Sequence, residues 1–274
     1  MRRGSTHLVG AWVATAAVVG LLLASGASAA KAPRTVALKV KWTGSGTVHV
    51  TGNKAFTCRA TVPTGNTCLH TFHVRRGRRI VLKAVPLAGW KMTAWAGACK
   101  GSAATCSLKL KARRSVGVTF VPPGDRLNPY PLGTSVLVAE GWRLKVNSAI
   151  INADTQVEAV TDQYGDHLNP PPPAGAQYTL VNATMTYVGG GSSGVAAYVL
   201  GYAVIKGAGN AGYAPDWQCT PPSPDLGAVG DIYSGQSATG NLCYEIASND
   251  ASTLLLSALG TNGQADQTVW FALH

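Results

Sequence analysis

Acidic residues are missing from a long part of this 274-residue chain. Residues 31–123 contain 17 Lys and Arg but no Asp or Glu, whereas residues 124–274 contain 4 basic and 12 acidic residues. The first segment therefore cannot form salt bridges within itself, and its positive charges repel one another unless an anion or an acidic partner compensates them. The overall net charge of +11 hides this contrast, which predicts two separate units.

A catalytic constellation is also missing. Residues 190–194 match the G-x-S-x-G pattern of a nucleophile elbow. That motif needs a strand that enters a helix, whereas these five small residues lie between two predicted strands and favour a turn. His167 adjoins an acidic residue but has no partner nucleophile. Two acidic pairs could serve hydrolysis or calcium binding, namely Asp162 with Asp166 and Asp225 with Asp231. Neither pair matches a calcium-loop spacing, and both lie among turn-forming residues, where Asp is common. We expect a protein that is not an enzyme and that needs no cofactor.

A long uncharged run lies near the N-terminus, from Leu8 to Ala24. Arg2 and Arg3 precede it and Ala27-Ser28-Ala29 follows, which is the pattern of a secretory signal with cleavage near Ala29. The alternative is an uncleaved anchor, because the 17 residues approach the length that spans a bilayer. No Cys stands at the cleavage site, which argues against a lipid anchor. We expect a secreted or cell-surface protein.

The cysteines number six, and all of them follow the signal segment. An even number in an exported chain favours disulfides over metal ligands. The short spacings make two natural pairs and leave a third, namely Cys58 with Cys68, Cys99 with Cys106 and Cys219 with Cys243. A zinc site would have to recruit His70 and His73 beside Cys68, but a spacing of three on a strand places the two imidazoles on opposite faces. We expect no metal.

Apolar residues alternate with other residues in several parts of residues 35–121. The alternation predicts strands at 36–42, 80–84, 108–110 and 116–120, with basic residues at many of the intervening positions. Because successive side chains of a strand point to opposite faces, we expect a small sheet domain with an apolar core and a cationic exterior. The candidate polyanion-binding residues are Arg75, Arg76, Arg78, Arg79, Lys39, Lys41, Lys109 and Lys111.

Several landmarks follow one another in the same segment. They are Gly44-Ser45-Gly46-Thr47-Val48, expected to open a hairpin, the loop between Cys58 and Cys68, Arg76-Gly77 before Ile80, Gly89-Trp90, and Trp95-Ala96-Gly97-Ala98-Cys99 before Cys106. Their order resembles the bacterial repeat domain of the divergent internalin B-repeat type. The resemblance implies a small β module of exported bacterial proteins without enzymatic activity. It also implies that Trp90 and Trp95 are core and loop anchors. The alternative is that these two tryptophans are exposed and stack on sugars.

Short apolar runs between turn signals recur in residues 130–274, after a Pro-rich linker at 122–129. Regularly spaced runs of this kind predict an immunoglobulin-like β-sandwich. The runs are 136–138, 142–146, 178–187, 196–205, 242–246 and 269–273. The whole chain is therefore expected to be all-β, with a small disulfide-stabilised β domain followed by the sandwich.

The landmarks of this second part are Leu132-Gly133, Gly141 to Val146, Asn169 to Gly175, Tyr187-Val188-Gly189 and Ser234 to Ile246. Their order resembles the telokin-like, immunoglobulin-fold domain found in secreted bacterial proteins, a family of unknown function. The resemblance implies an extracellular accessory or binding module and assigns no site residue.

The cationic exterior has two interpretations. In the first, it binds an anionic polymer of the cell envelope or the surroundings, such as teichoic acid, lipopolysaccharide, an acidic polysaccharide or an anionic lipid surface. In the second, it docks against the acidic second domain, and the protein is a structural module without a polymer ligand. Nucleic acid is disfavoured because we expect the protein to be exported and because it has no known reading motif. We expect a secreted, non-enzymatic binding or accessory protein, with an extracellular hydrolase as the weaker alternative.

Overall fold

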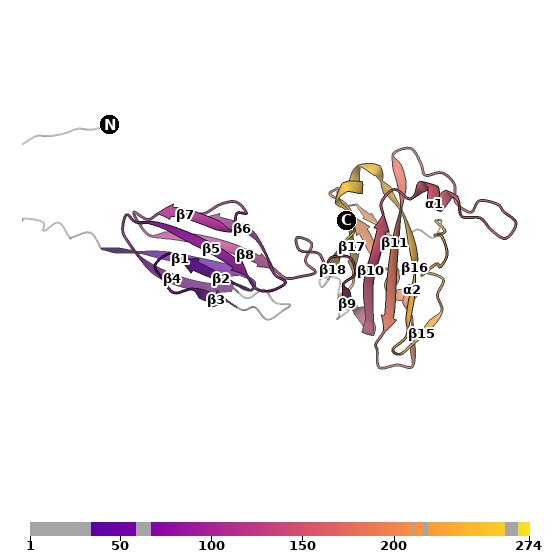
Figure 1. The fold of residues 1–274 in the computed structure, drawn as a ribbon, viewed down its shortest axis with the longest axis horizontal. Helices are drawn as coiled ribbons and strands as arrows, with labels where there is room; N and C mark the ends of the chain where they lie inside the picture. The colour runs from indigo at the N-terminus through magenta and orange to yellow at the C-terminus, as the bar shows by residue number, and fades with distance from the viewer. Residues whose placement is uncertain (1–33, 59–66, 210, 216–218, 261–267) are drawn as a thin grey trace, which may run out of the picture. The chain divides into compact units, whose positions relative to one another are not determined.

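The chain forms strands in almost every part that the structure describes. The computed structural model describes residues 34–58, 67–209, 211–215, 219–260 and 268–274, so the signal expected at residues 1–29 lies outside it. Two groups of sheets are present (Figure 1), each around its own hydrophobic core. We call residues 34–121 the N-terminal sandwich and residues 130–274 the C-terminal sandwich. The predicted all-β fold class is confirmed.

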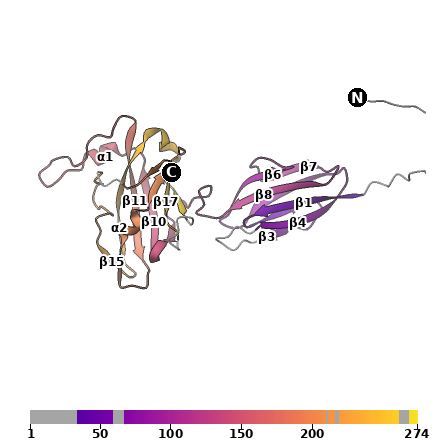
Figure 2. The same cartoon turned by 180° about the vertical axis from the view of Figure 1, so that it is seen from behind.

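Eight strands make up the described part of the N-terminal sandwich. Their bounds are β1 Thr35–Thr43, β2 Gly46–Val50, β3 Phe56–Cys58, β4 Thr67–Arg75, β5 Arg79–Pro86, β6 Lys91–Gly97, β7 Thr105–Lys109 and β8 Arg114–Val121. The β1 sheet has the order β4-β1-β8-β6 and the β5 sheet has the order β3-β2-β5-β7. Figure 2 shows the same strands from behind. Only the pairing of β1 with β8 is parallel among these neighbours.

Alternation in the sequence decides which face of each sheet is buried. In β1 the side chains of Val36, Leu38, Val40 and Trp42 are buried, and those between them are not. Strands β5 and β8 show the same period of two, so that the apolar faces of both sheets meet in a single core. Trp95 belongs to this core and its Nε1–H donates to the carbonyl of Ala103 at 2.7 Å, which makes it an anchor.

The three predicted disulfides are present. Cys58 in β3 is bonded to Cys68 in β4, and Cys99 after β6 is bonded to Cys106 in β7. Since β4 and β6 belong to the β1 sheet and β3 and β7 to the β5 sheet, each bond connects the two layers. The third bond joins Cys219 in a loop to Cys243, which lies in a strand of the C-terminal sandwich.

The stretch Gly44 to Val48 opens a hairpin, because β2 pairs antiparallel with β3, the next strand along the chain. Strands β1 and β2 do not pair with each other but belong to different sheets. Gly44 and Ser45 carry the chain from one layer to the other, and Ser45 is buried. Gly44 has a φ of +84° and packs against the carbonyl of Phe120, where a side chain would not fit. The turn at Gly44 and Ser45 is therefore determined by packing on the core, and not by hydrogen bonds between β1 and β2.

The C-terminal sandwich has two four-stranded sheets and a two-stranded ribbon in its described residues. The strands are β9 Ser135–Val138, β10 Trp142–Ile150, β11 Ala176–Tyr187, β12 Ser193–Val195, β13 Val204–Lys206, β14 Gly212–Tyr213, β15 Asp231–Tyr233, β16 Ser237–Ala247, β17 Leu255–Ala258 and β18 Val269–Ala272. The β11 sheet has the order β16-β11-β10-β9, the β17 sheet has the order β14-β13-β17-β18, and β12 pairs with β15. Trp142, Tyr244 and Phe271 are buried in the core that both sheets share.

Short helices complete this part. They are α1 Asp154–Glu158, α2 Ala196–Leu200 and the 3-10 turns η1 Ala139–Gly141 and η2 Ser248–Thr253. The strand expected at 196–205 is wrong in its first half, because α2 occupies it. The buried residues Ala196, Val199 and Leu200 follow the helical spacing of three and four rather than alternation. Among the helices of the described residues, none has the length and apolar character required to cross a bilayer.

Candidate functional site

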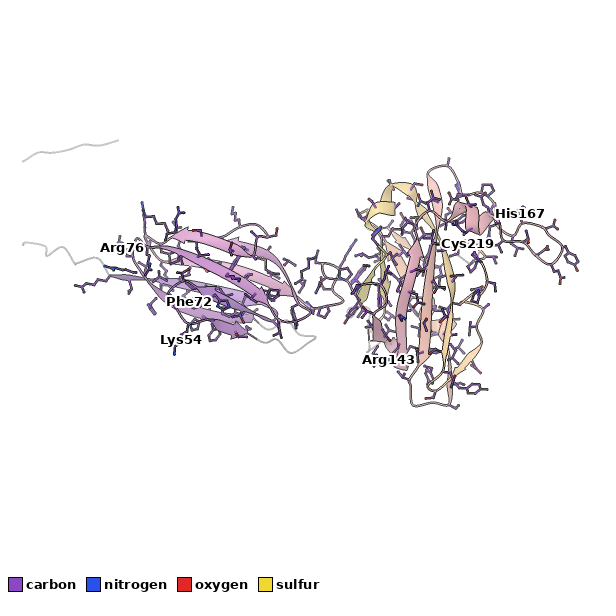
Figure 3. The ribbon with its side chains drawn as sticks, viewed as in Figure 1. Lys54, Phe72, Arg76, Arg143, His167 and Cys219 are labelled. Atoms are coloured by element: carbon purple, nitrogen blue, oxygen red, sulfur yellow. A yellow bond between two sulfur atoms is a disulfide. The ribbon has the colours of Figure 1, made fainter. Side chains whose placement is uncertain are left out.

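Basic side chains gather at one end of the N-terminal sandwich, and we call this group the basic end. Figure 3 labels Arg76 among them. All nine members are exposed to solvent. They are Arg34, Arg75, Arg76, Arg78, Arg79, Lys109, Lys111, Arg113 and Arg114.

Backbone hydrogen bonds hold three chain segments together at the basic end. The turn between β4 and β5 is joined to the connection between β7 and β8, because Gly77 N–H donates to Leu110 O at 2.6 Å and Leu110 N–H donates to Arg78 O at 3.1 Å. The same turn is joined to the start of β1, where Arg76 N–H donates to Arg34 O at 2.9 Å. Residues far apart in the sequence thus present their cations at one place.

Two of these cations lie directly opposite each other on neighbouring strands. Arg79 of β5 and Lys109 of β7 are paired in register. Side chains at directly opposed positions have their Cβ atoms about 4.5–5.5 Å apart, and like charges there are destabilising. Because residues 31–123 contain no carboxylate, no side chain of this segment can relieve the repulsion. A bound anion would relieve it.

The structure brings together six of the eight residues that the sequence suggested for polyanion binding. Lys39 and Lys41 are the exceptions. In β1, Arg75 is opposite Thr35, so Lys39 lies four positions further along the strand, about 13 Å from Arg75 at 3.3 Å per residue. Lys39 is opposite Ser115, the residue that follows Arg114. Both lysines lie on the outer face of the β1 sheet, where Lys39 borders the basic end and Lys41 lies beyond it.

Three members of the basic end were not suggested by the sequence analysis. Arg34 immediately precedes β1, Arg113 immediately precedes β8, and Arg114 is the first residue of β8. The available signal was the Arg113-Arg114 dipeptide directly before the alternating residues 116–120. Its meaning depends on the contact between Leu110 and the β4–β5 turn, which the sequence does not show.

The histidines considered for zinc have other environments. The ring of His70 stacks on that of Phe56, with 4.2 Å between the centroids, and its proposed partner Cys68 is in a disulfide. His73 is exposed on the outer face of β4, opposite Ala37. The described residues contain no group of three or more His, Cys, Asp or Glu side chains arranged to hold a metal ion.

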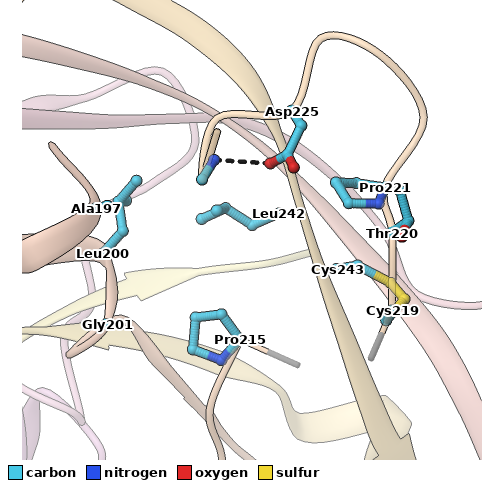
Figure 4. A pocket seen from close by; sticks show the side chains of 11 residues that line it. Ala197, Leu200, Gly201, Pro215, Cys219, Thr220, Pro221, Asp225, Leu242 and Cys243 are labelled. Carbon is cyan, nitrogen blue, oxygen red and sulfur yellow. Dashed lines mark hydrogen bonds between the residues drawn. A yellow bond between two sulfur atoms is a disulfide. The ribbon is translucent and has the colours of Figure 1, made fainter. Parts of the chain in front are cut away.

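A small pocket lies in the C-terminal sandwich beside α2 (Figure 4). Its volume is about 100 Å³, and its lining includes Ala197, Leu200, Pro215, Leu242 and the disulfide of Cys219. Asp225 is the titratable side chain among its described lining residues, and its carboxylate accepts a hydrogen bond from the Gly227 N–H at 2.7 Å. The carboxylate thus stabilises a turn, and the rest of the lining is mostly apolar, with Thr220 as its hydroxyl side chain.

The other acidic pair also stabilises a turn. The Asp162 carboxylate accepts hydrogen bonds from the backbone N–H groups of Tyr164 at 2.8 Å and Asp166 at 3.0 Å. His167 Nδ1–H donates to the carbonyl of Glu158 at 2.6 Å. The two contacts of Asp162 are typical of Asp in turns.

The outer face of the β11 sheet carries a network of polar side chains. Amide groups form a chain across three strands, because Asn147 donates to Asn182 at 2.9 Å and Asn182 donates to Asn241 at 2.8 Å. Asn241 in turn donates to the carbonyl of Pro222 at 2.8 Å. Hydroxyl pairs continue the network at 2.7 Å each, namely Thr184 with Thr239 and Thr186 with Ser237. These amide and hydroxyl groups form hydrogen bonds with one another. Their presence on this outer face is therefore explained without a ligand.

The chain matches no family model and no curated protein. Two solved structures are similar to it. A conserved hypothetical protein from Bacillus anthracis is 12% identical, with 47% of this chain and 88% of that chain covered and a TM-score of 0.35. An uncharacterised β-sandwich protein from Clostridium difficile 630 is 10% identical, with 54% of this chain and 95% of that chain covered and a TM-score of 0.34. No site residue is transferred from them.

Proposed function

We propose that the protein is a secreted, non-enzymatic binding protein whose basic end holds an anionic polymer of the cell envelope or of the surroundings. The observation that carries this proposal is the basic end itself, where nine exposed cations are joined by backbone contacts in a segment without any carboxylate. Export supports a polymer of the envelope over nucleic acid as the ligand. This preference rests on the signal pattern of residues 1–29.

Several weak contacts must act together at such a site. A single exposed ion pair contributes about 0–1 kcal/mol in solution because water and salt screen it. A polymer with many charges can occupy several cations at once, and its binding releases the counterions that accompany it. We therefore expect affinity to depend on the number of basic-end residues and to fall steeply with ionic strength.

The test is retention of the purified protein on an immobilised polyanion at increasing NaCl. We expect elution of the wild-type protein at high salt, and early elution of a variant that carries Arg75→Ser, Arg76→Ser, Arg78→Ser and Arg79→Ser. The matched control removes four charges elsewhere, through Lys41→Ser, Lys54→Ser, Lys83→Ser and Lys100→Ser, and it should elute distinctly later than the arginine variant. Equal elution of the two variants would assign retention to net charge alone and would contradict a defined site.

We also propose that the N-terminal sandwich is related to the bacterial repeat domain and the C-terminal sandwich to the telokin-like domain. The first kinship is supported by the structural roles of its landmark residues. Gly97 has a φ of +77°, and a side chain there would approach the carbonyl of Ser115 to 2.7 Å. Trp95 is buried and Cys99 is bonded to Cys106. The second kinship is supported by the pairing of two β-sheets around one core.

A further inference from the structure

The linker that follows the N-terminal sandwich, residues 122–129, is folded. Pro123 and Leu127 are its exposed residues, and the others are at least partly shielded from water. Its backbone forms a tight turn, because Asn128 N–H donates to the carbonyl of Asp125 at 2.8 Å. The Asp125 carboxylate stabilises this turn by accepting a hydrogen bond from Leu127 N–H, also at 2.8 Å. A flexible spacer would instead behave as a random coil.

Two hydrogen bonds attach the linker to the N-terminal sandwich. The side-chain amide of Asn128 donates to the carbonyl of Gly89 at 2.8 Å. The ammonium group of Lys91 donates to the carbonyl of Leu127 at 2.9 Å. Gly89 lies in the turn between β5 and β6, and Lys91 is the first residue of β6. The linker and the sandwich thus each contribute one donor and one acceptor to this attachment.

Three contacts attach the same linker to the C-terminal sandwich. Trp270 N–H in β18 donates to the carbonyl of Gly124 at 2.9 Å. The guanidinium of Arg126 donates to the carbonyl of Gly207 at 3.0 Å, and it lies 5.2 Å from the centre of the Trp270 ring, as in a cation–π contact. Gly124 is buried, and a Cβ atom there would approach the ring of Tyr130 to 2.5 Å. The linker is therefore packed against this sandwich as well as hydrogen-bonded to it.

Proline reduces the cost of holding the linker in one conformation. Pro122, Pro123 and Pro129 each have a fixed φ angle, so the linker has less conformational freedom to lose than a segment of other residues. Each of the contacts described above is weak by itself, but all of them act on a short segment that is already restricted. The same contacts on a Gly-rich linker would have a larger loss of freedom to offset.

We infer that residues 122–129 form a structural joint, bound to both sandwiches at once, that restrains the movement of one sandwich relative to the other. The joint depends on Asn128 for its attachment to the N-terminal sandwich and on Arg126 for its attachment to the C-terminal sandwich. This inference goes beyond the proposed function, since it concerns neither the basic end nor its ligand. Either proposal can therefore fail without the other.

Trypsin tests whether the joint is closed, because the bond between Arg126 and Leu127 is the one bond of the linker that it can cut. A protease requires a locally unfolded chain, so the cutting rate reports how often the linker opens. The reference is a synthetic peptide of residues 119–132, in which this bond is always accessible. We expect the intact protein to be cut there at least tenfold more slowly than the peptide, as measured by mass spectrometry. A smaller difference would overturn the inference.

Substitutions on the two sides of the joint provide matched comparisons. Asn128→Ala removes one attachment, and Arg126→Lys keeps the charge and the trypsin site but removes the guanidinium. Relative to a peptide of its own sequence, each variant should be cut at least fivefold faster at residue 126 than wild type. The controls are Asn53→Ala after β2 and Arg143→Lys in β10, which should leave this rate unchanged. Cutting after Lys83, inside β5, should stay constant and shows that the fold is kept. Wild-type rates in both joint variants would contradict the roles of these two side chains.

Nitrogen-15 relaxation distinguishes a joint bound to both sandwiches from a linker that is folded on only one. Sandwiches restrained by the joint should tumble with a common rotational correlation time. The double variant Arg126→Lys, Asn128→Ala should show two shorter and unequal times, because each sandwich then moves more independently. Two unequal times in the wild-type protein would overturn the inference, even if the linker resists trypsin.

Discussion

Gly44 and Gly77 both have positive φ angles, +84° and +81°, in very different surroundings. A Cβ atom at Gly77 would meet no other atom within 4 Å, whereas at Gly44 it would overlap the carbonyl of Phe120 and the ring of Trp90. A non-glycine residue would therefore have an unfavourable backbone conformation at both positions. Only at Gly44 would its side chain also clash with neighbouring atoms.

This difference predicts unequal effects of the same substitution. Gly77→Ala should lower the free energy of unfolding by about 1 kcal/mol, which is the cost of a non-glycine residue in the left-handed region. Gly44→Ala should lower it by about 3 kcal/mol or more, because the overlap with the core must also be relieved. Urea unfolding of both variants measures the difference. Similar values for the two would show that the Gly44 turn can move away from Phe120.

Tyr213 and Asp250 form the clearest titratable contact in the C-terminal sandwich. The Tyr213 hydroxyl donates to the Asp250 carboxylate at 2.9 Å, and Asp250 is 7% exposed. Burial raises the pKa of Tyr213 above its usual value of 10, and the hydrogen bond to Asp250 raises this pKa further. The folded state therefore favours the neutral phenol more than the unfolded state does.

The pH dependence follows from this direction. The contribution of the contact is fully present below pH 10 and is lost as the pH rises through the higher pKa of folded Tyr213. Tyr213→Phe should lower the free energy of unfolding by about 1.5–3 kcal/mol at pH 7, as expected for a hydrogen bond to a charged group. Tyr164→Phe is the control, since Tyr164 is 81% exposed. A loss for Tyr213→Phe no larger than for the control would contradict this account.

At the scale of the elements, the disulfides differ in the length of chain that they close. The sequence separations are 10 for Cys58–Cys68, 7 for Cys99–Cys106 and 24 for Cys219–Cys243. On the loop-entropy model, the three bonds contribute about 2.8, 2.5 and 3.5 kcal/mol respectively when the native geometry is unstrained.

Paired Cys→Ser variants test this ranking. We expect the loss of Cys219–Cys243 to lower the free energy of unfolding of its sandwich most. In the N-terminal sandwich, the loss of either bond should cost about 2–3 kcal/mol, because both connect its two layers. Guanidinium unfolding monitored by tryptophan fluorescence is the measurement. A much larger loss for one N-terminal bond than for the other would show that packing, rather than loop closure, dominates its contribution.

Elements also show how far the sequence determines the fold. Clear alternation predicted β1, β5 and β8, since their apolar residues recur at every second position. Strand β4 was not predicted because only Phe72 and Val74 are buried in it. The continuous apolar run at 196–205 is compatible with the spacing of a helix and with the alternation of a strand. Only packing determines that it begins as the helix α2.

The candidate site was predictable in part for a related reason. The local cluster Arg75 to Arg79 is visible as a charge run, and its place in a turn follows from Gly77. Arg34, Arg113 and Arg114 join it only through contacts between segments that are distant in the sequence. Local patterns cannot show such contacts, because the strand order of a sheet depends on the packing of the whole sandwich.

At the scale of the whole molecule, the division of charge predicts how the protein associates with cells. Residues 31–123 carry a formal charge of +17, and residues 124–274 carry −8. If the basic end holds an envelope polymer, washing producing cells with 1 M NaCl should release wild-type protein, since the Debye length falls to about 3 Å. The Arg75 to Arg79 neutral variant should be found in the medium without the wash. Wild-type protein free in low-salt medium would favour the structural module without a polymer ligand.

The strand β8 connects the two ends of the N-terminal sandwich. It begins at Arg114 in the basic end and finishes at Val121, where the chain leaves toward the linker. In the β1 sheet it lies between β1 and β6 and is hydrogen-bonded to both. If a polymer holds Arg114 of the basic end and a force acts through the linker, the pull is directed along β8, across its inter-strand hydrogen bonds. Hydrogen bonds loaded in this direction share the force, so we expect β8 to resist such a pull better than a strand that is peeled away from one end.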